Sequence, residues 1–197
     1  MTNKIYALVG PHAAGKTTLI GQLISMGLNY IPTYTTRTPG KIDSDTTYFK
    51  FISKEKFFKM DFIVKVTYKG DYYGILKKDI LTALQTKSIS LIMLDANGLK
   101  QLTKLFKGNL ESIYIMCDYV ALVERMLRMG HTNADIKYNL EYSENNNEFD
   151  TWKVTTHVVK NVSDPRIALN QILALMGLMT VSPMAQVVSP KPPIDTL

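Results

Sequence analysis

A glycine-rich segment near the start of the chain most constrains its fold. It reads Gly-Pro-His-Ala-Ala-Gly-Lys-Thr over residues 10–17, after an apolar run at 5–9 and before helically spaced apolar residues at 16–24. The pattern G-x-x-x-x-G-K-[ST] between a strand and a helix is that of a phosphate-binding loop. The sequence therefore predicts a strand, a loop and a helix that together hold a polyphosphate.

Each fixed position of this loop has a separate part in phosphate binding. Its glycines let consecutive backbone N–H groups and the positive end of the helix face the phosphates. Lys16 supplies positive charge to the β- and γ-phosphates, and the Thr17 hydroxyl is a ligand for Mg²⁺. We expect ATP and Mg²⁺ here, and the predicted ATP contacts are Gly10, His12, Ala13, Ala14, Gly15, Lys16, Thr17 and Thr18. A lone histidine such as His12 fills a variable loop position more often than it acts as a base.

The rest of the chain alternates apolar β-rich runs with helical patterns. The runs lie at 89–94, 113–116 and 154–159, and the helical patterns that follow them lie at 98–106, 119–129 and 165–176. Such alternation predicts an α/β fold of the P-loop NTPase class, with a parallel sheet flanked by helices. The last helix is expected to begin at Pro165, with Ser163 or Asp164 as its N-cap, and to end before Gly177.

Three stretches depart from this alternation. Residues 30–51 and 62–73 are rich in Thr, Tyr, Phe and Val and are broken by Pro and Gly, which predicts a β-rich insertion. Residues 130–150 are polar and predicted to be helical, and they form a candidate mobile segment. After residue 179 the periodicity ends and half of the 8 prolines occur, so we expect a flexible tail over 180–197.

Composition narrows the class of protein. A chain of 197 residues with 46% hydrophobic and 20% charged residues fits one globular domain and excludes wholesale disorder. Cys117 is alone and cannot form an internal disulfide, and the longest apolar stretch, 172–181, is too short to span a membrane. Because the amino terminus has no secretion signal, we expect a cytoplasmic protein without a membrane partner.

The formal net charge of +6 suits nucleic acid, a membrane surface or an anionic small molecule. The basic residues are spread along the chain, so a solvated surface with one anion pocket explains the excess as well as a polyanion groove does. A nucleic-acid partner stays open but is not indicated, and no oligomeric state is predicted.

Asp95 is a second candidate for the chemistry, since it follows the buried-looking run at 89–94. At the carboxyl end of a parallel strand, an acidic residue can hold a water on Mg²⁺ or orient the acceptor. A strand-terminal aspartate also commonly caps a turn or helix, and the residue alone leaves both roles open.

Taken in order, the motifs of this chain resemble those of guanylate kinases. They are the phosphate loop at 10–18, Thr-Thr-Arg-Thr-Pro at 35–39, Phe-Ile-Ser at 51–53 before a charged helix, Tyr-Tyr-Gly at 72–74 and Asp-Ala-Asn-Gly at 95–98. The resemblance runs from about residue 4 to 176 and implies one domain at 1–179. Within it, the core is expected at 1–29, 88–130 and 151–179, a monophosphate-binding insertion at 30–87, and a helical lid at 131–150.

The resemblance also implies residues that bind the acceptor. Arg37 stands on the arginine that grips the acceptor phosphate, and a guanidinium fork suits that task. The other positions that match the family's acceptor site are Thr33, Tyr73 and Asp95.

Several family positions differ here. Gly40 and Phe49 replace a phosphate-binding arginine and tyrosine, and Lys41 and Tyr48 are the neighbouring candidates to substitute for them. Val64 and Ile75 replace the polar residues that read guanine. Leaving the polar edge of guanine unpaired costs about 1–3 kcal/mol per group, so we expect a smaller or less polar base.

The lid differs as well. Gly-His-Thr at 130–132 stands where the family has Arg-Gly-Thr, and a later lid arginine falls near Asn139. Arg125 and Arg128 remain on one helix face, where they either reach nucleotide phosphates or are ordinary solvated residues.

The leading hypothesis is a kinase that moves the γ-phosphoryl group of ATP onto a nucleoside monophosphate other than ordinary GMP. Its expected catalytic residues are Lys16, Arg37, Asp95 and Arg128, with Thr17 and Asp95 at Mg²⁺. The alternatives are a true guanylate kinase, and an interaction module that has kept the fold and lost the chemistry. The complete phosphate loop argues against the module.

Overall fold

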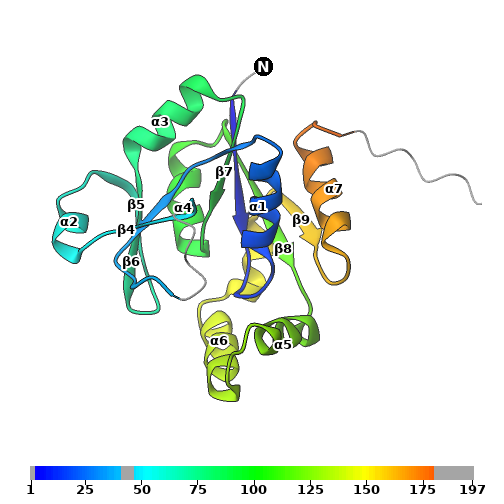
Figure 1. Cartoon of the computed structure of the whole chain (residues 1–197). Helices are drawn as coiled ribbons and strands as arrows, with labels where there is room; N and C mark the ends of the chain where they lie inside the picture. The colour runs from blue at the N-terminus through cyan, green and yellow to red at the C-terminus, as the bar shows by residue number, and fades with distance from the viewer. Residues whose placement is uncertain (1–2, 41–46, 180–197) are drawn as a thin grey trace, which may run out of the picture.

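A five-stranded sheet forms the centre of the computed structural model, which describes residues 3–40 and 47–179 (Figure 1). Its strands, in the order β2-β7-β1-β8-β9, are β2 (Asn29–Tyr30), β7 (Ile89–Met93), β1 (Lys4–Val9), β8 (Leu110–Met116) and β9 (His157–Lys160). Every neighbouring pair in this core sheet is parallel. The predicted α/β fold with a parallel sheet is therefore confirmed.

Helices cover both faces of the core sheet. α1 (Lys16–Ser25) and α7 (Pro165–Leu175) pack on one face, and α3 (Lys77–Thr86) and α4 (Ala96–Leu105) pack on the other (Figure 1). Alternate residues of β1 serve the two layers: Tyr6 and Leu8 join the first hydrophobic cluster, and Ile5, Ala7 and Val9 join the second. β1 is thus buried on both sides, as expected for a parallel strand between helices.

A second sheet lies beside the core, in the order β4-β3-β6-β5. Its strands are β3 (Thr33–Thr35), β4 (Phe49–Phe51), β5 (Phe62–Tyr68) and β6 (Asp71–Leu76), with α2 (Lys54–Phe58) packed on it. Gly74 of the Tyr-Tyr-Gly motif lies against Phe62, and a Cβ there would approach the ring to 2.7 Å. The β5–β6 hairpin turns at Lys69 and Gly70, whose φ values of 51° and 86° are those of a tight two-residue turn.

Two helices, α5 (Tyr119–Arg128) and α6 (Asn133–Asn145), lie together at the lower end of the molecule in Figure 1. Gly130, with a φ of 82°, ends α5, and Thr132 begins α6 through a reciprocal capping box with Asp135. A short 3₁₀ segment, η1 (Glu148–Val154), returns the chain to the core sheet. The polar stretch 130–150 is therefore largely helical, as predicted.

One predicted strand is displaced. The apolar run at 154–159 was expected to be extended throughout, yet Val154 ends η1 with 75% of its surface exposed. Pairing with β8 begins only at His157, which is opposite Ile113. The expected insertion at 30–87 also contains the helix α3, whose Ile80 and Ala83 are buried against the core sheet. In the described part of the chain, the structure has no helix of the length and apolarity that crossing a bilayer requires.

Candidate active site

A cavity of about 1130 Å³ opens at the carboxyl end of the core sheet, where ligands of open α/β folds bind. The phosphate loop, the second sheet, α5 and the connection that follows it all contribute to its walls. It brings together twelve of the predicted site residues: Gly10, His12, Ala13, Gly15, Lys16, Thr17, Thr18, Thr33, Arg37, Tyr73, Asp95 and Arg128. Ala14, also in the loop, is buried, and Lys41 lies outside the described residues.

The phosphate loop has a backbone that favours glycine at both of its ends, Gly10 and Gly15. Gly15 has a φ of 96°, and a Cβ there would collide with the side chain of Asn161. The loop then enters α1, whose first turn therefore points its N–H groups into the cavity. The local sequence thus forms the tight turn from loop to helix that the motif predicted.

Two side chains from distant segments hold this loop in place. Asn161, directly after β9, donates through Nδ2 to the carbonyl oxygen of Ala14 at 2.8 Å. The guanidinium of Arg125 on α5 donates to the carbonyl oxygens of Ala13, Ala14 and Asn161 at 3.3, 3.1 and 2.5 Å. Arg125 therefore fastens the loop to α5 and to the end of β9. Sequence analysis did not identify Asn161, whose only signal is its place after an apolar run.

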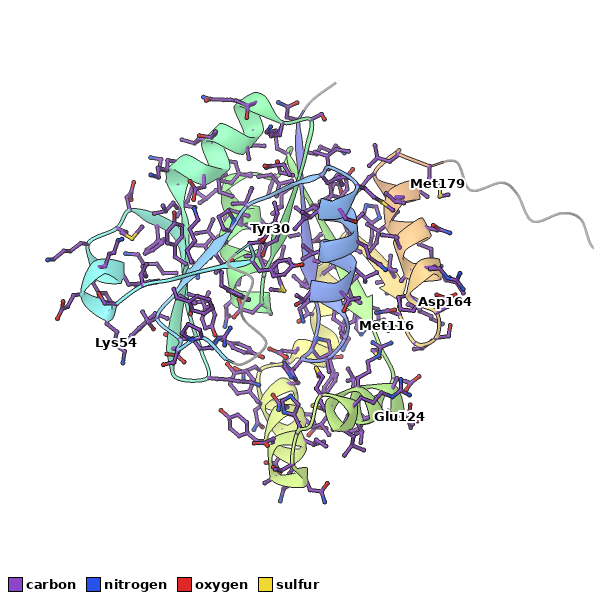
Figure 2. All side chains as sticks on the ribbon, viewed as in Figure 1. Tyr30, Lys54, Met116, Glu124, Asp164 and Met179 are labelled. Atoms are coloured by element: carbon purple, nitrogen blue, oxygen red, sulfur yellow. The ribbon has the colours of Figure 1, made fainter. Side chains whose placement is uncertain are left out.

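Arg128 lies one helical turn further along α5, at the rim of the cavity. Its side chain is 77% exposed and pairs with Glu124, labelled in Figure 2, at 3.3 Å. Such an exposed pair contributes little to stability, so Arg128 can reorient toward a bound phosphate.

Lys16 and Glu148 form the charged floor of the cavity. Lys16 donates through Nζ to the carbonyl oxygens of Gly10 and Pro11 at 2.7 and 2.8 Å, and burial lowers its pKa to about 8. Glu148 is 6% exposed, accepts a hydrogen bond from Ser143 Oγ at 2.7 Å, and has a pKa raised by burial. The charge of Glu148 favours the protonated form of Lys16. Nothing in the local sequence distinguishes this glutamate, and only the fold places it here.

His12 links the loop to the α5–α6 connection. Its ring meets that of His131 edge to face, with centroids 5.4 Å apart. Burial, followed by the charges of Lys69 and Lys16, lowers the pKa of His12 to about 3. The ring is therefore neutral at physiological pH.

Arg37 lies on the opposite wall, held by aromatic rings. Its guanidinium carbon is 5.4 Å from the Phe49 ring centroid and 5.5 Å from that of Phe51, within cation–π range. Tyr48 faces the other way: its ring meets that of Tyr30, at the middle of the molecule in Figure 2, with centroids 5.7 Å apart. Phe49, and not Tyr48, therefore lines the cavity.

A deep apolar wall closes the cavity on the side of the second sheet. Val64 and Ile75 are direct partners across the β5–β6 ladder, each is 1% exposed, and both line the cavity with Leu94. Thr33 adds a buried hydroxyl that has no hydrogen-bond partner in the part of the chain that the structure describes. This wall offers a ligand apolar contact and one polar group.

Asp95 both caps a helix and lines the cavity. Its Oδ1 accepts the Gly98 N–H at 2.7 Å, which starts α4, and burial raises the pKa of its carboxyl group. A carboxylate retains further acceptor sites, and the Thr17 hydroxyl lines the same cavity. These two oxygen donors fit Mg²⁺, which uses few protein ligands when phosphates supply the others. Over the described ranges, no group of three His, Cys, Asp or Glu side chains could hold a metal ion.

Comparisons with known proteins extend across this fold. A family model described as guanylate kinase matches residues 2–167. The guanylate kinase of Bartonella henselae is 30% identical to this chain, over 87% of this chain and 78% of its own length. That of Bartonella quintana is 31% identical, over 80% of this chain and 73% of its own length. The crystal structure of guanylate kinase from Anaplasma phagocytophilum shares the fold with a TM-score of 0.70 at 18% identity, covering 89% of this chain and 85% of that one. The matched residues include the phosphate loop, the second sheet and both α5 and α6.

Proposed function

The chain belongs to the guanylate kinase family and is a P-loop nucleotide kinase, and from that premise we propose that it phosphorylates a pyrimidine nucleoside monophosphate at the expense of ATP. Family membership supports phosphoryl transfer between nucleotides. The choice of acceptor rests on this chain's own cavity.

One observation carries the acceptor assignment: the paired Val64 and Ile75 wall. Guanine presents an N1–H and an exocyclic amine on one edge, and these donors need buried acceptors. Val64 and Ile75 supply none, so each unpaired donor would lose about 1–3 kcal/mol of binding free energy. A smaller pyrimidine can place its apolar C5–C6 edge on this wall and use the Thr33 hydroxyl for a polar group.

The reaction exchanges one P–O bond for another. The bond between the γ-phosphorus and the β,γ-bridging oxygen breaks, its electron pair stays with ADP, and a phosphate oxygen of the monophosphate forms the new bond. Lys16 carries positive charge to the transferring group, and Arg37 grips the acceptor phosphate. Thr17 and Asp95 would hold the Mg²⁺ that accompanies ATP, and the ion would compensate negative charge on the phosphates. Catalysis then consists of alignment and charge compensation, without proton transfer by His12.

The first test is an assay of ATP consumption, with Mg²⁺ and with mass detection of products, across GMP, dGMP, AMP, CMP, dCMP, UMP, dUMP and dTMP. We expect selective turnover of a pyrimidine monophosphate. Rapid turnover of GMP would overturn the acceptor assignment and support the second candidate, a true guanylate kinase, which the similarity to named guanylate kinases favours. ATP binding without turnover would point to an interaction module.

A specificity exchange tests the wall directly. The double variant Val64→Glu with Ile75→Thr places polar partners on it, and we expect the GMP-to-pyrimidine ratio of kcat/KM to rise at least about tenfold. The control, Thr67→Glu, adds the same charge at an exposed position of β5 that does not line the cavity. An unchanged ratio in a folded double variant would show that the wall does not read the base.

A further inference from the structure

Lys69 is a cation that the proposed mechanism has not used. It lies at the tip of the β5–β6 hairpin, lines the large cavity, and donates through Nζ to Oδ1 of Asn139 on α6. Its ammonium group also lies among three tyrosine rings, 5.2 Å from the centroid of Tyr68, 5.5 Å from Tyr138 and 5.4 Å from Tyr142. The second sheet therefore brings a positive charge to its junction with α6, beside the cavity.

The side chain of Asn139 is oriented to accept a hydrogen bond from Lys69. It is 6% exposed, and its Nδ2 donates to the carbonyl oxygen of Asp135 at 2.7 Å, which leaves the amide oxygen for Lys69. Asn139 also stands near the position where the family resemblance places a lid arginine. An arginine there would repel Lys69, whereas an amide oxygen accepts from it. The two residues thus form a matched pair, with the cation on the hairpin and its acceptor on α6.

The hairpin places Lys69 at a position that is unusual for a lysine. Its φ of 51° belongs to the left-handed region, where Gly, Asn and Asp are favoured at such turns. Lysine is therefore not the residue that turn geometry alone would select here.

The charge of Lys69 also acts on two residues of the phosphate loop. Its charge lowers the pKa of both His12 and Lys16, and Glu148 counteracts the fall in the pKa of both lysines. The guanidinium of Arg125 on α5 is already engaged, because it donates to three backbone carbonyl oxygens. Arg128 stands at the rim.

We propose that Lys69 is a catalytic residue that contacts the γ-phosphoryl group during transfer. Asn139 and the three tyrosines orient its ammonium group when the hairpin and α6 are together. Lys69 keeps its proton and compensates negative charge, while the P–O bonds change as described above. The inference rests on the proposed phosphotransferase function but not on the identity of the acceptor.

The test compares nucleotides that differ at the γ-phosphate. Calorimetry measures binding of Mg²⁺ with AMP-PNP, a non-hydrolysable ATP analogue, and of Mg²⁺ with ADP to the full chain. In Lys69→Met, which keeps the apolar stem, we expect AMP-PNP affinity to fall on the order of tenfold while ADP affinity stays within about twofold. Lys69→Arg is expected to restore the preference for AMP-PNP over ADP. Lys65 is an exposed lysine on the same hairpin, and Lys65→Met should leave that preference unchanged.

Two outcomes would overturn the proposal. If Lys69→Met weakened the binding of AMP-PNP and ADP equally, Lys69 would only connect the hairpin to α6. An unchanged preference for AMP-PNP over ADP would exclude contact with the γ-phosphate. The variant Tyr138→Leu, which removes one ring of the cage but keeps the charge, is expected to retain most of the preference. Because no acceptor is present, failure of this test is distinct from absence of monophosphate turnover by the wild-type protein. Where turnover is measured, Lys69→Met should lower kcat with the acceptor KM little changed.

Discussion

At the scale of the residue, environment decides what Lys16 can do. Burial lowers its pKa to about 8, so its charge is poised close to physiological pH. A polyphosphate stabilises the protonated form, which means that above pH 8 binding must be accompanied by proton uptake. The lysine therefore makes nucleotide affinity dependent on pH in a range where the phosphates themselves no longer titrate.

We predict that affinity for Mg²⁺ with AMP-PNP is nearly constant from pH 7 to 8 and then falls, by up to about tenfold per pH unit. Calorimetry across pH 7 to 10 measures it. Lys16→Met should bind more weakly at pH 7 and lose most of this dependence, and it should abolish turnover. An unaltered pH profile in a folded Lys16→Met variant would assign the titration to another group, of which Lys69 is the nearest candidate.

The same shift has a consequence for stability without ligand. The pKa of Lys16 is about 8 in the folded protein and near its ordinary 10.5 in the unfolded chain. Between these values the unfolded chain binds more protons, so this lysine makes the free energy of unfolding increase as pH rises through that window. We expect urea unfolding of the wild-type protein, relative to Lys16→Met, to show this increase from pH 8 to 10. A difference that stays flat or declines would contradict the burial of a charged Lys16.

At the scale of the element, the phosphate loop is correctly shaped because distant elements hold it. Asn161 is 3% exposed, and its side-chain amide donates to the carbonyl oxygen of Ala14 from the end of β9. The backbone carbonyl oxygen of Asn161 accepts a hydrogen bond from Arg125. Removing the amide leaves a buried carbonyl oxygen with one partner fewer, at a cost of about 1–3 kcal/mol. The side chains of Asn161 and Arg125 therefore couple the loop to the core sheet.

We predict that Asn161→Ala lowers the free energy of unfolding by about 1–3 kcal/mol and also weakens AMP-PNP binding. The matched control is Asn146→Ala, since Asn146 makes the same kind of bond to the Tyr142 carbonyl at an exposed site. The control should change stability by less than about 0.5 kcal/mol. Urea unfolding monitored by circular dichroism distinguishes them, and equal effects would show that Asn161 is not a loop anchor.

The elements that the sequence could predict are those whose signals are local. The periodicity around α1 and α7, the N-cap at Asp164 and the glycine at 177 lie within their own segments. The displaced β9 and the core-facing α3 depend on partners far along the chain, so their patterns were ambiguous. The site divides in the same way. Lys16 and Thr17 belong to a contiguous motif, whereas Glu148 and Asn161 reach the cavity only through the fold.

At the scale of the whole molecule, three parts meet around one cavity and are joined with unequal strength. The core sheet is buried between two helical layers, whereas contacts between the hairpin tip and α6 consist of a few aromatic rings and Lys69. Regions with few buried apolar contacts open at lower free energy than the core. Because nucleotides must enter and leave this cavity, the junction of the hairpin tip and α6 is the expected place of opening.

Hydrogen exchange measured by mass spectrometry tests that expectation. Amides of α6 and of the hairpin tip should exchange faster than those of β1 and β8, since the former open locally and the latter require unfolding of the core. Mg²⁺ with AMP-PNP and an accepted monophosphate should slow exchange at α6 and the tip and leave β1 and β8 nearly unchanged. In Lys16→Met the same ligands should slow amide exchange at α6 and the hairpin tip only a little. This control distinguishes closure caused by nucleotide at the phosphate loop from nonspecific binding. Uniform protection across all elements would mean that the molecule opens as one unit, and the entry of nucleotides would then need another route.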